Sequence, residues 1–88
     1  MASKRRSDQI LSEILDACQG KGEIKTKIVY RVNLNFKTVN LHLDILLANE
    51  LLEMIDGPLV LYRTTEKGAQ VLELMKEIER LMPVEISS

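Results

Sequence analysis

Apolar residues follow the spacing of an α-helix along most of this chain and the spacing of a β-strand over one short stretch. Helical spacing, with an apolar side chain every three or four residues, recurs in four segments. Between the third and the fourth, residues 51–55 and 59–64 read as short strands on either side of Asp56-Gly57-Pro58, which predicts a hairpin with a tight turn. The order helix, helix, helix, hairpin, helix constrains the fold more than any other feature.

Residues suited to capping stand at the ends of the expected helices. The four segments run from Ser7 to the Gly20-Lys21-Gly22 stop, from about Lys25 to Val32, from Phe36 to about Asn49, and from Glu66 to about Met82. Ser7, Asn35 and Thr65 are suited to cap the first, third and fourth helices, because a side-chain oxygen at that place accepts from a first-turn N–H. Asn33 is expected to end the second helix in a left-handed conformation, which Asn tolerates better than most residues.

The expected core is aliphatic, because aromatic residues make up only 3% of the 88 residues. A chain of this length is one domain near the lower limit for a self-sufficient core. The stripe expected to be buried in the third helix consists of Phe36, Val39, Leu43, Leu46 and Leu47. Cys18 is expected as a small core residue at the end of the first helix, and His42 as a partly exposed structural histidine.

Catalytic and metal-binding chemistry has almost no support in this sequence. The chain has one histidine and one cysteine without placed partners, and it has no glycine-rich phosphate loop. We therefore expect no enzyme, no metal and no cofactor.

No apolar run approaches the roughly 18 residues of a membrane span, no export signal follows the first charges, and a lone cysteine fits a reducing compartment. These features predict a cytoplasmic protein without a membrane partner.

The charges are unevenly distributed, although the net charge is only −1. Residues 1–40 hold eight basic and four acidic residues, a balance of +4, whereas residues 41–88 hold four basic and nine acidic residues, a balance of −5. Such asymmetry favours an anionic partner on the basic side. Residues 1–6 include Lys4-Arg5-Arg6 and form an expected basic arm, which either adds phosphate contacts or only increases solubility.

The element order is that of a winged helix-turn-helix: an α+β fold, mainly α, with three helices, a short β-hairpin wing and a long C-terminal helix. The stretches IKTKIVYRVNLNFKTVNLHLDILLANELLE and LYRTTEKG also resemble the small archaeal winged-helix DNA-binding proteins, whose mass of about ten kilodaltons matches the 10.0 kDa of this chain. Members of that family are transcriptional regulators or chromosomal proteins. Residues 25–35 match the family pattern K-T-x-I-x-Y-x-x-N-L-[ST] except at Asn35, which is expected to cap equally well.

The resemblance implies binding to double-stranded DNA as a nucleoid-associated transcriptional regulator, with helix 35–49 as the recognition helix in the major groove. The expected DNA contacts are Lys25, Lys27, Arg31, Asn35, Lys37, Thr38, Asn40, Leu41 and Arg63. Among them Asn40 is suited to adenine and Leu41 to a thymine methyl group. Arg63 is the only basic residue near the wing, whose short acidic tip suits minor-groove insertion poorly.

A protein-interaction module that kept the fold without strong DNA affinity is the alternative interpretation. The mildly acidic pI, the acidic wing tip, and Leu41 and Ile45 on the outer face of the third helix favour it. The basic first half and the polar start of that helix favour DNA.

The last helix carries an apolar stripe that a small domain covers only in part. The stripe consists of Val71, Leu74, Met75, Ile78, Leu81 and Met82. Its a/d-like spacing predicts a two-fold homodimer through this helix, and the alternative is that the helix folds back onto the first helix of its own chain. The expected parts are therefore a basic arm at 1–6, the winged domain at 7–64, a dimerisation helix at 65–83 and a disordered tail at 84–88.

Overall fold

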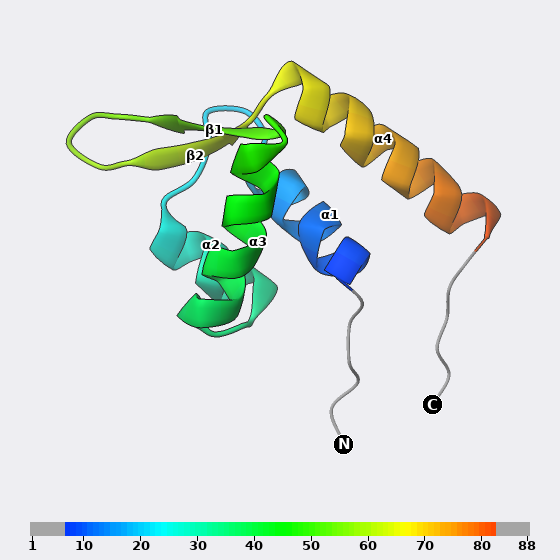
Figure 1. Ribbon diagram of the computed structural model, residues 1–88, viewed down its shortest axis with the longest axis horizontal. Coiled ribbons are helices and arrows are strands. Elements are labelled where there is room, and N and C mark those ends of the chain that lie inside the picture. Colours follow the sequence, from blue (N-terminus) through cyan, green and yellow to red (C-terminus); the bar gives the residue numbers. More distant parts are fainter. Residues whose placement is uncertain (1–6, 83–88) are drawn as a thin grey trace.

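The computed structural model describes residues 7–82 and has the helices and strands in the predicted order (Figure 1). The elements are α1 (Ser7–Ala17), α2 (Lys25–Val32), α3 (Phe36–Ala48), β1 (Leu52–Ile55), β2 (Leu61–Thr64) and α4 (Glu66–Leu81). The two strands form an antiparallel hairpin, so the predicted winged helix-turn-helix architecture is confirmed. The predicted arm at 1–6 and tail at 84–88 lie outside the described residues.

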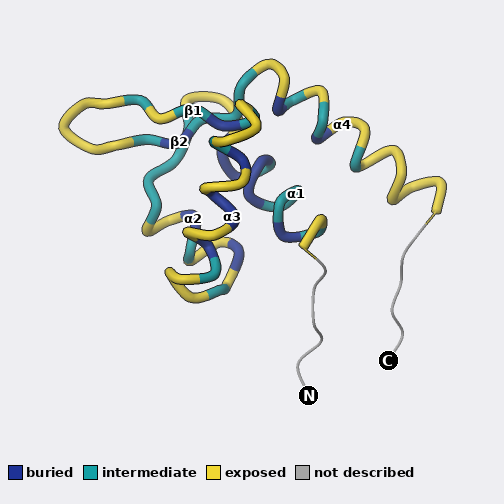
Figure 2. The backbone as a smooth tube through the Cα atoms, viewed as in Figure 1, coloured by how far each residue is buried: buried dark blue, intermediate teal, exposed yellow. Residues whose placement is uncertain are grey.

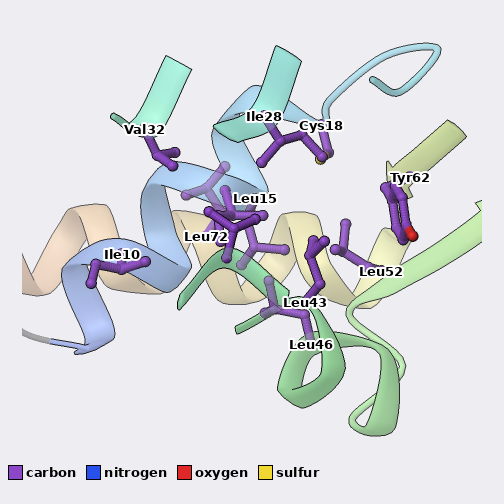
Figure 3. Packing of buried hydrophobic residues seen from close by; sticks show 12 residues of the cluster. Ile10, Leu15, Cys18, Ile28, Val32, Leu43, Leu46, Leu52, Tyr62 and Leu72 are labelled. Carbon is purple, nitrogen blue, oxygen red and sulfur yellow. The ribbon is translucent and has the colours of Figure 1, made fainter. Parts of the chain in front are cut away.

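One aliphatic core joins α1, α2 and α3 to the start of α4 (Figure 3). The most deeply buried large side chains of the described part are Ile14, Leu15, Ile28, Leu43, Leu46, Leu72, Val32, Val39 and Cys18. Each aliphatic side chain of this kind stabilises the fold by about 1.5–3 kcal/mol through removal from water. Burial raises the pKa of the Cys18 thiol to about 12, with the charge of Glu23 acting in the same direction, so the thiol is protonated at neutral pH. The predicted core role of Cys18 is confirmed.

The buried side of α3 follows the predicted stripe except at its first residue. Val39, Leu43 and Leu46 are buried, and Leu47 is partly buried against the core. The prediction was wrong for Phe36, whose side chain is 50% exposed. A helical side chain leans toward the N-terminus of its helix, so the side chain of this first residue extends past the end of the core.

His42 was predicted to be partly exposed, and the structure buries it among the core-facing residues of α3. Its Nδ1 lies 2.8 Å from the Thr38 carbonyl oxygen, so that nitrogen carries the proton and donates it. Its Nε2 lies 3.5 Å from Ser7 Oγ, on α1. A buried imidazole is tolerated here because both ring nitrogens face a polar partner. Ser7 itself lies within α1 rather than capping it from outside, which corrects a second prediction.

The hairpin differs from the predicted tight turn. Its last paired residues are Ile55 and Leu61, so residues 56–60 form a five-residue connection. Pro58 removes one backbone N–H from this stretch, which disfavours further pairing there. Sequence analysis also missed an antiparallel bridge between Glu23 and Tyr62, which ties the wing to the loop before α2 through hydrogen bonds of 2.8 and 2.9 Å. A single bridge leaves no periodic pattern in a sequence.

Two threonines connect the wing to the helices. Thr64 Oγ1 donates to the Leu15 carbonyl oxygen at 2.7 Å, which holds the end of β2 against α1. Thr65 Oγ1 accepts from Gly68 N at 2.9 Å and donates to the Glu50 carbonyl oxygen at 2.8 Å. The hydroxyl of Thr65 therefore caps α4, as predicted, and also fixes the start of α4 to the end of α3.

The first half of α4 packs on α1, and the second half extends away from the domain (Figures 1 and 2). Leu72 is buried, and Val71 and Met75 pack partly buried against the core. Lys76 Nζ lies 3.4 Å from Asp16 Oδ1 on α1. Beyond this ion pair every described residue of α4 is exposed.

Replacement of Gly68 should destabilise the fold although alanine is the better helix former. A Cβ atom at this position would lie 2.1 Å from the Leu51 carbonyl oxygen and 2.9 Å from Thr64 Cγ2. We expect Gly68→Ala to lower the free energy of unfolding by about 1–3 kcal/mol, as overpacking does, measured by urea denaturation. Gly57→Ala is the control, because its nearest neighbour would lie at 3.6 Å. An unchanged midpoint for Gly68→Ala would show that the junction is looser than the structure indicates.

Candidate nucleic-acid interface

The turn between α2 and α3 sets the direction of α3. Asn33 has the predicted left-handed conformation, with φ at 58°, and its N–H donates to the Val29 carbonyl oxygen at 2.9 Å. Asn35 Oδ1 accepts from Thr38 N at 2.7 Å and caps α3, also as predicted. Because this amide oxygen is occupied by the cap, Asn35 offers an outside partner its remaining polar atoms only.

Three of the four predicted base-contacting side chains of α3 share one exposed face. Lys37, Asn40 and Leu41 are exposed and lie opposite the buried stripe of the helix. Thr38 lies at the edge of this face, partly buried, and its carbonyl oxygen is bonded to His42. Lys37 makes no ion pair with any residue between 7 and 82. The start of α3 therefore presents an uncompensated ammonium group and an amide to the outside.

The basic side chains of α2 differ in how far their charges are available to an anion outside the domain. Lys27 is exposed and has no ionic partner within the described part of the chain. Lys25 Nζ lies 5.9 Å from the centre of the Tyr62 ring on the wing, at cation–π distance. Arg31 Nη2 lies 3.7 Å from Asp16 Oδ2, so its charge is partly balanced on the α1 side of the domain.

Arg63, the only basic residue predicted to act from the wing, is engaged inside the hairpin. It stands directly opposite Glu53, and both its Nε and one Nη lie 2.8 Å from Glu53 Oε2. A charge paired in this way attracts an outside anion less than a free one does. The structure thus concentrates the available positive charge on α2 and α3, whereas the one basic residue of the wing is paired.

Tyr30 was not among the residues predicted from the sequence, although its side chain is 88% exposed on α2. It lies on the opposite side of that helix from Ile28 and Val32, which are buried, and on the same side as Lys27. The sequence could have indicated this exposure, because Tyr30 is placed opposite the apolar residues of a helix with this spacing. The hydroxyl of such a side chain can donate to a phosphate oxygen.

The six side chains predicted for a dimer interface fall into two groups. Val71 and Met75 pack against the core of their own chain. The exposed group consists of Leu74, Ile78, Leu81 and Met82. The second half of α4 is exposed along its length (Figure 2). Leu74, Ile78 and Leu81 keep the four-then-three spacing of a coiled-coil seam.

Other types of site were sought in residues 7–82. Within this range no three histidine, cysteine, aspartate or glutamate side chains gather in a way that would hold a metal ion. No helix in the same range has the length and apolar character needed to cross a membrane.

Comparison with known proteins agrees with this architecture. A family model described as winged helix-turn-helix matches residues 4–83, so the chain belongs to the winged helix-turn-helix family. An uncharacterised protein of Methanocaldococcus jannaschii is 40% identical over 79 residues. That match covers 90% of this chain and 36% of the relative, so the chain spans about a third of the relative's length.

Two solved structures from Sulfolobus solfataricus have a similar fold. One is Sso10a-2, a DNA-binding protein, with a TM-score of 0.79 and 23% identity over 88% of this chain and 81% of that chain. The other is the transcriptional regulator BldR, with a TM-score of 0.78 and 23% identity over 84% of this chain and 56% of that chain. These likenesses establish the shared fold and agree with the resemblance to archaeal winged-helix proteins.

The cap at Asn35 gives a test of how the interface is built. We expect Asn35→Ala to lower the free energy of unfolding by about 1 kcal/mol, because Thr38 N loses its acceptor. Asn35→Asp keeps that acceptor and should keep the stability within about 0.5 kcal/mol. Thermal unfolding followed by circular dichroism measures both variants. Equal losses for alanine and aspartate would show that the cap does not hold the start of α3.

Proposed function

We propose that this protein binds double-stranded DNA, with α3 as the recognition helix in the major groove. The observation that carries the proposal is the exposed face of α3, where the free ammonium group of Lys37 and the amide of Asn40 lie opposite the buried side of the helix. A helix held in this way can enter a groove about 12 Å wide without disturbing the core. Membership of the winged helix-turn-helix family supports the proposal.

Each polar side chain on this side has a role that follows from its chemistry. Asn40 pairs with N6 and N7 of adenine, and the Thr38 hydroxyl can bond to either kind of base. Lys37 contacts phosphate or guanine, and Lys27 contacts phosphate from α2. Tyr30 adds a phosphate contact beside Lys27. Lys25, Arg31, Asn35 and Arg63 contribute less, because each already interacts within the domain.

The biological role we infer is regulation of transcription in association with the nucleoid. The support is the fold shared with a DNA-binding protein and with a transcriptional regulator. Binding of chromosomal DNA would place the protein with the nucleoid in the cytoplasm.

Loss of the charge at Lys37 should weaken DNA binding. We expect the unaltered protein to bind random-sequence duplex DNA with micromolar affinity at about 50 mM salt and far more weakly at 200 mM, because neutralised phosphates release counterions. Lys37→Glu should lower the affinity at least ten-fold. It should also reduce the slope of log affinity against log salt concentration by about one. Fluorescence anisotropy of a labelled duplex measures both quantities.

Lys67→Glu is the matched control for this experiment. It makes the same change in charge at an exposed position on α4, where the ammonium group donates to the Asn49 carbonyl oxygen beyond the far end of α3. The control should bind DNA within about two-fold of the unaltered protein. A similar loss in both variants would indicate a general charge effect rather than contact through α3.

We also propose that two copies associate through the end of α4. The exposed side chains of Leu74, Ile78 and Leu81 form a short seam that a second copy of the same seam would cover. A two-fold dimer would present two α3 helices, which can occupy successive major grooves about 34 Å apart.

Introduction of a charge into the seam should separate the copies. We expect the unaltered protein to sediment at about twice its chain mass of 10.0 kDa and Ile78→Glu to sediment as a folded monomer, because the carboxylate would be buried without a partner. Leu59→Glu is the control, since Leu59 is equally apolar and exposed but lies on the wing connection. A monomeric unaltered protein in equilibrium ultracentrifugation would refute the dimer.

A protein-interaction module is the second candidate. The observation that favours it is the pair of exposed apolar side chains Leu41 and Ile45 on α3. A purified protein that bound no duplex DNA at about 50 mM salt would support this candidate against the first.

A further inference from the structure

The exposed side of α3 contains an apolar pair that phosphate binding does not explain. Leu41 is 58% exposed and Ile45 is 46% exposed. They are four residues apart and therefore adjacent on one side of the helix. Neither belongs to the core or to the partly buried residues packed against it. The pair therefore keeps its apolar surface in water unless something outside the domain covers it.

The position of the pair limits what can cover it. Leu41 lies one turn after Lys37 on the exposed face of α3, and Ile45 lies one turn further on. If α3 enters the major groove, these side chains face the edges of base pairs. The large apolar group that base pairs present in that groove is the C5-methyl of thymine.

We propose that Leu41 and Ile45 read the C5-methyl groups of thymine, so that the protein prefers duplexes rich in A·T pairs. The inference rests on the proposed entry of α3 into the major groove, and it adds the class of sequence to that function. Four residues of helix rise by about 6 Å, which is close to two base steps of about 3.4 Å. The two side chains can therefore contact methyl groups on base pairs two steps apart in one docked position.

The amide on the exposed face and the absence of arginine from α3 agree with this preference. Asn40 is suited to the N6 and N7 atoms of adenine. Asp44 is suited to the N4 amino group of cytosine and does not contribute to the preference. Arginine, the side chain that most often reads guanine, is absent from α3. The arginine on the wing, Arg63, is paired with Glu53 and is therefore less available to read guanine.

The test compares duplexes that differ only in methyl groups. Anisotropy at a fixed salt concentration of about 50 mM measures the binding of an A·T-rich duplex and of the same duplex with uracil in place of thymine. We expect the uracil duplex to bind about four-fold more weakly for each contacted methyl group. A G·C duplex that contains 5-methylcytosine should bind more tightly than its unmethylated form, because the added methyl group occupies the same place in the groove.

Two variants assign the effect to the pair. Leu41→Ala and Ile45→Ala should each reduce the preference for thymine over uracil. Leu59→Ala removes an equally exposed aliphatic side chain from the wing connection and should keep the full preference. Circular dichroism melting confirms that each variant is folded.

The outcomes separate this inference from the proposed function. Tight and equal binding of the thymine and uracil duplexes would overturn methyl reading while DNA binding stands. A preference that persists in Leu41→Ala and Ile45→Ala would also overturn the assignment to this pair. No binding to either duplex would overturn the proposed function together with the inference, and would leave the pair as a contact for a protein partner.

Discussion

The three aliphatic side chains that α3 buries, Val39, Leu43 and Leu46, determine the direction in which its other side faces. Since a helix turns by about 100° per residue, burial of this stripe leaves Lys37 and Leu41 pointing away from the domain. The same helix therefore supplies the centre of the core and the proposed contact surface. Rotation of α3 would move these aliphatic side chains out of the core. The orientation of the outer face is therefore maintained as long as the core stays packed.

The second constraint is the junction at which hairpin, α3 and α4 meet. The Thr64 hydroxyl binds the wing to α1, and the Thr65 hydroxyl binds α4 to the end of α3. Gly68 lets the first turn of α4 approach the backbone at Leu51 more closely than any side chain would permit. These contacts direct α4 along α1 and then outward, so the exposed end of α4 follows from local hydrogen bonds and one missing Cβ atom.

Periodicity predicted most of the fold because it reports which residues share a side of an element. It found Val39 and Leu43 in the core, but it could not show where the core ends, so Phe36 was placed wrongly. His42 was expected to be partly exposed, and only the fold shows that Thr38 and Ser7 provide the partners that allow its burial. For the candidate site, spacing identified the outer face of α3. It could not show that Arg63 stands opposite an acid on the neighbouring strand.

The pairing of charges bears on the proposed binding of DNA by a protein of net charge −1. Arg31 and Arg63 are partly balanced by acids, and Lys25 contacts the Tyr62 ring, so Lys27 and Lys37 are the cations of α2 and α3 that make no such contact within residues 7–82. So few free cations per copy give weak binding. Two copies joined through α4 would double these contacts, and the second copy would bind at a high effective concentration, which raises the affinity. The apolar end of α4 and the sparse charge of the α3 face are therefore consistent with one design, in which association supplies the affinity that a single domain lacks.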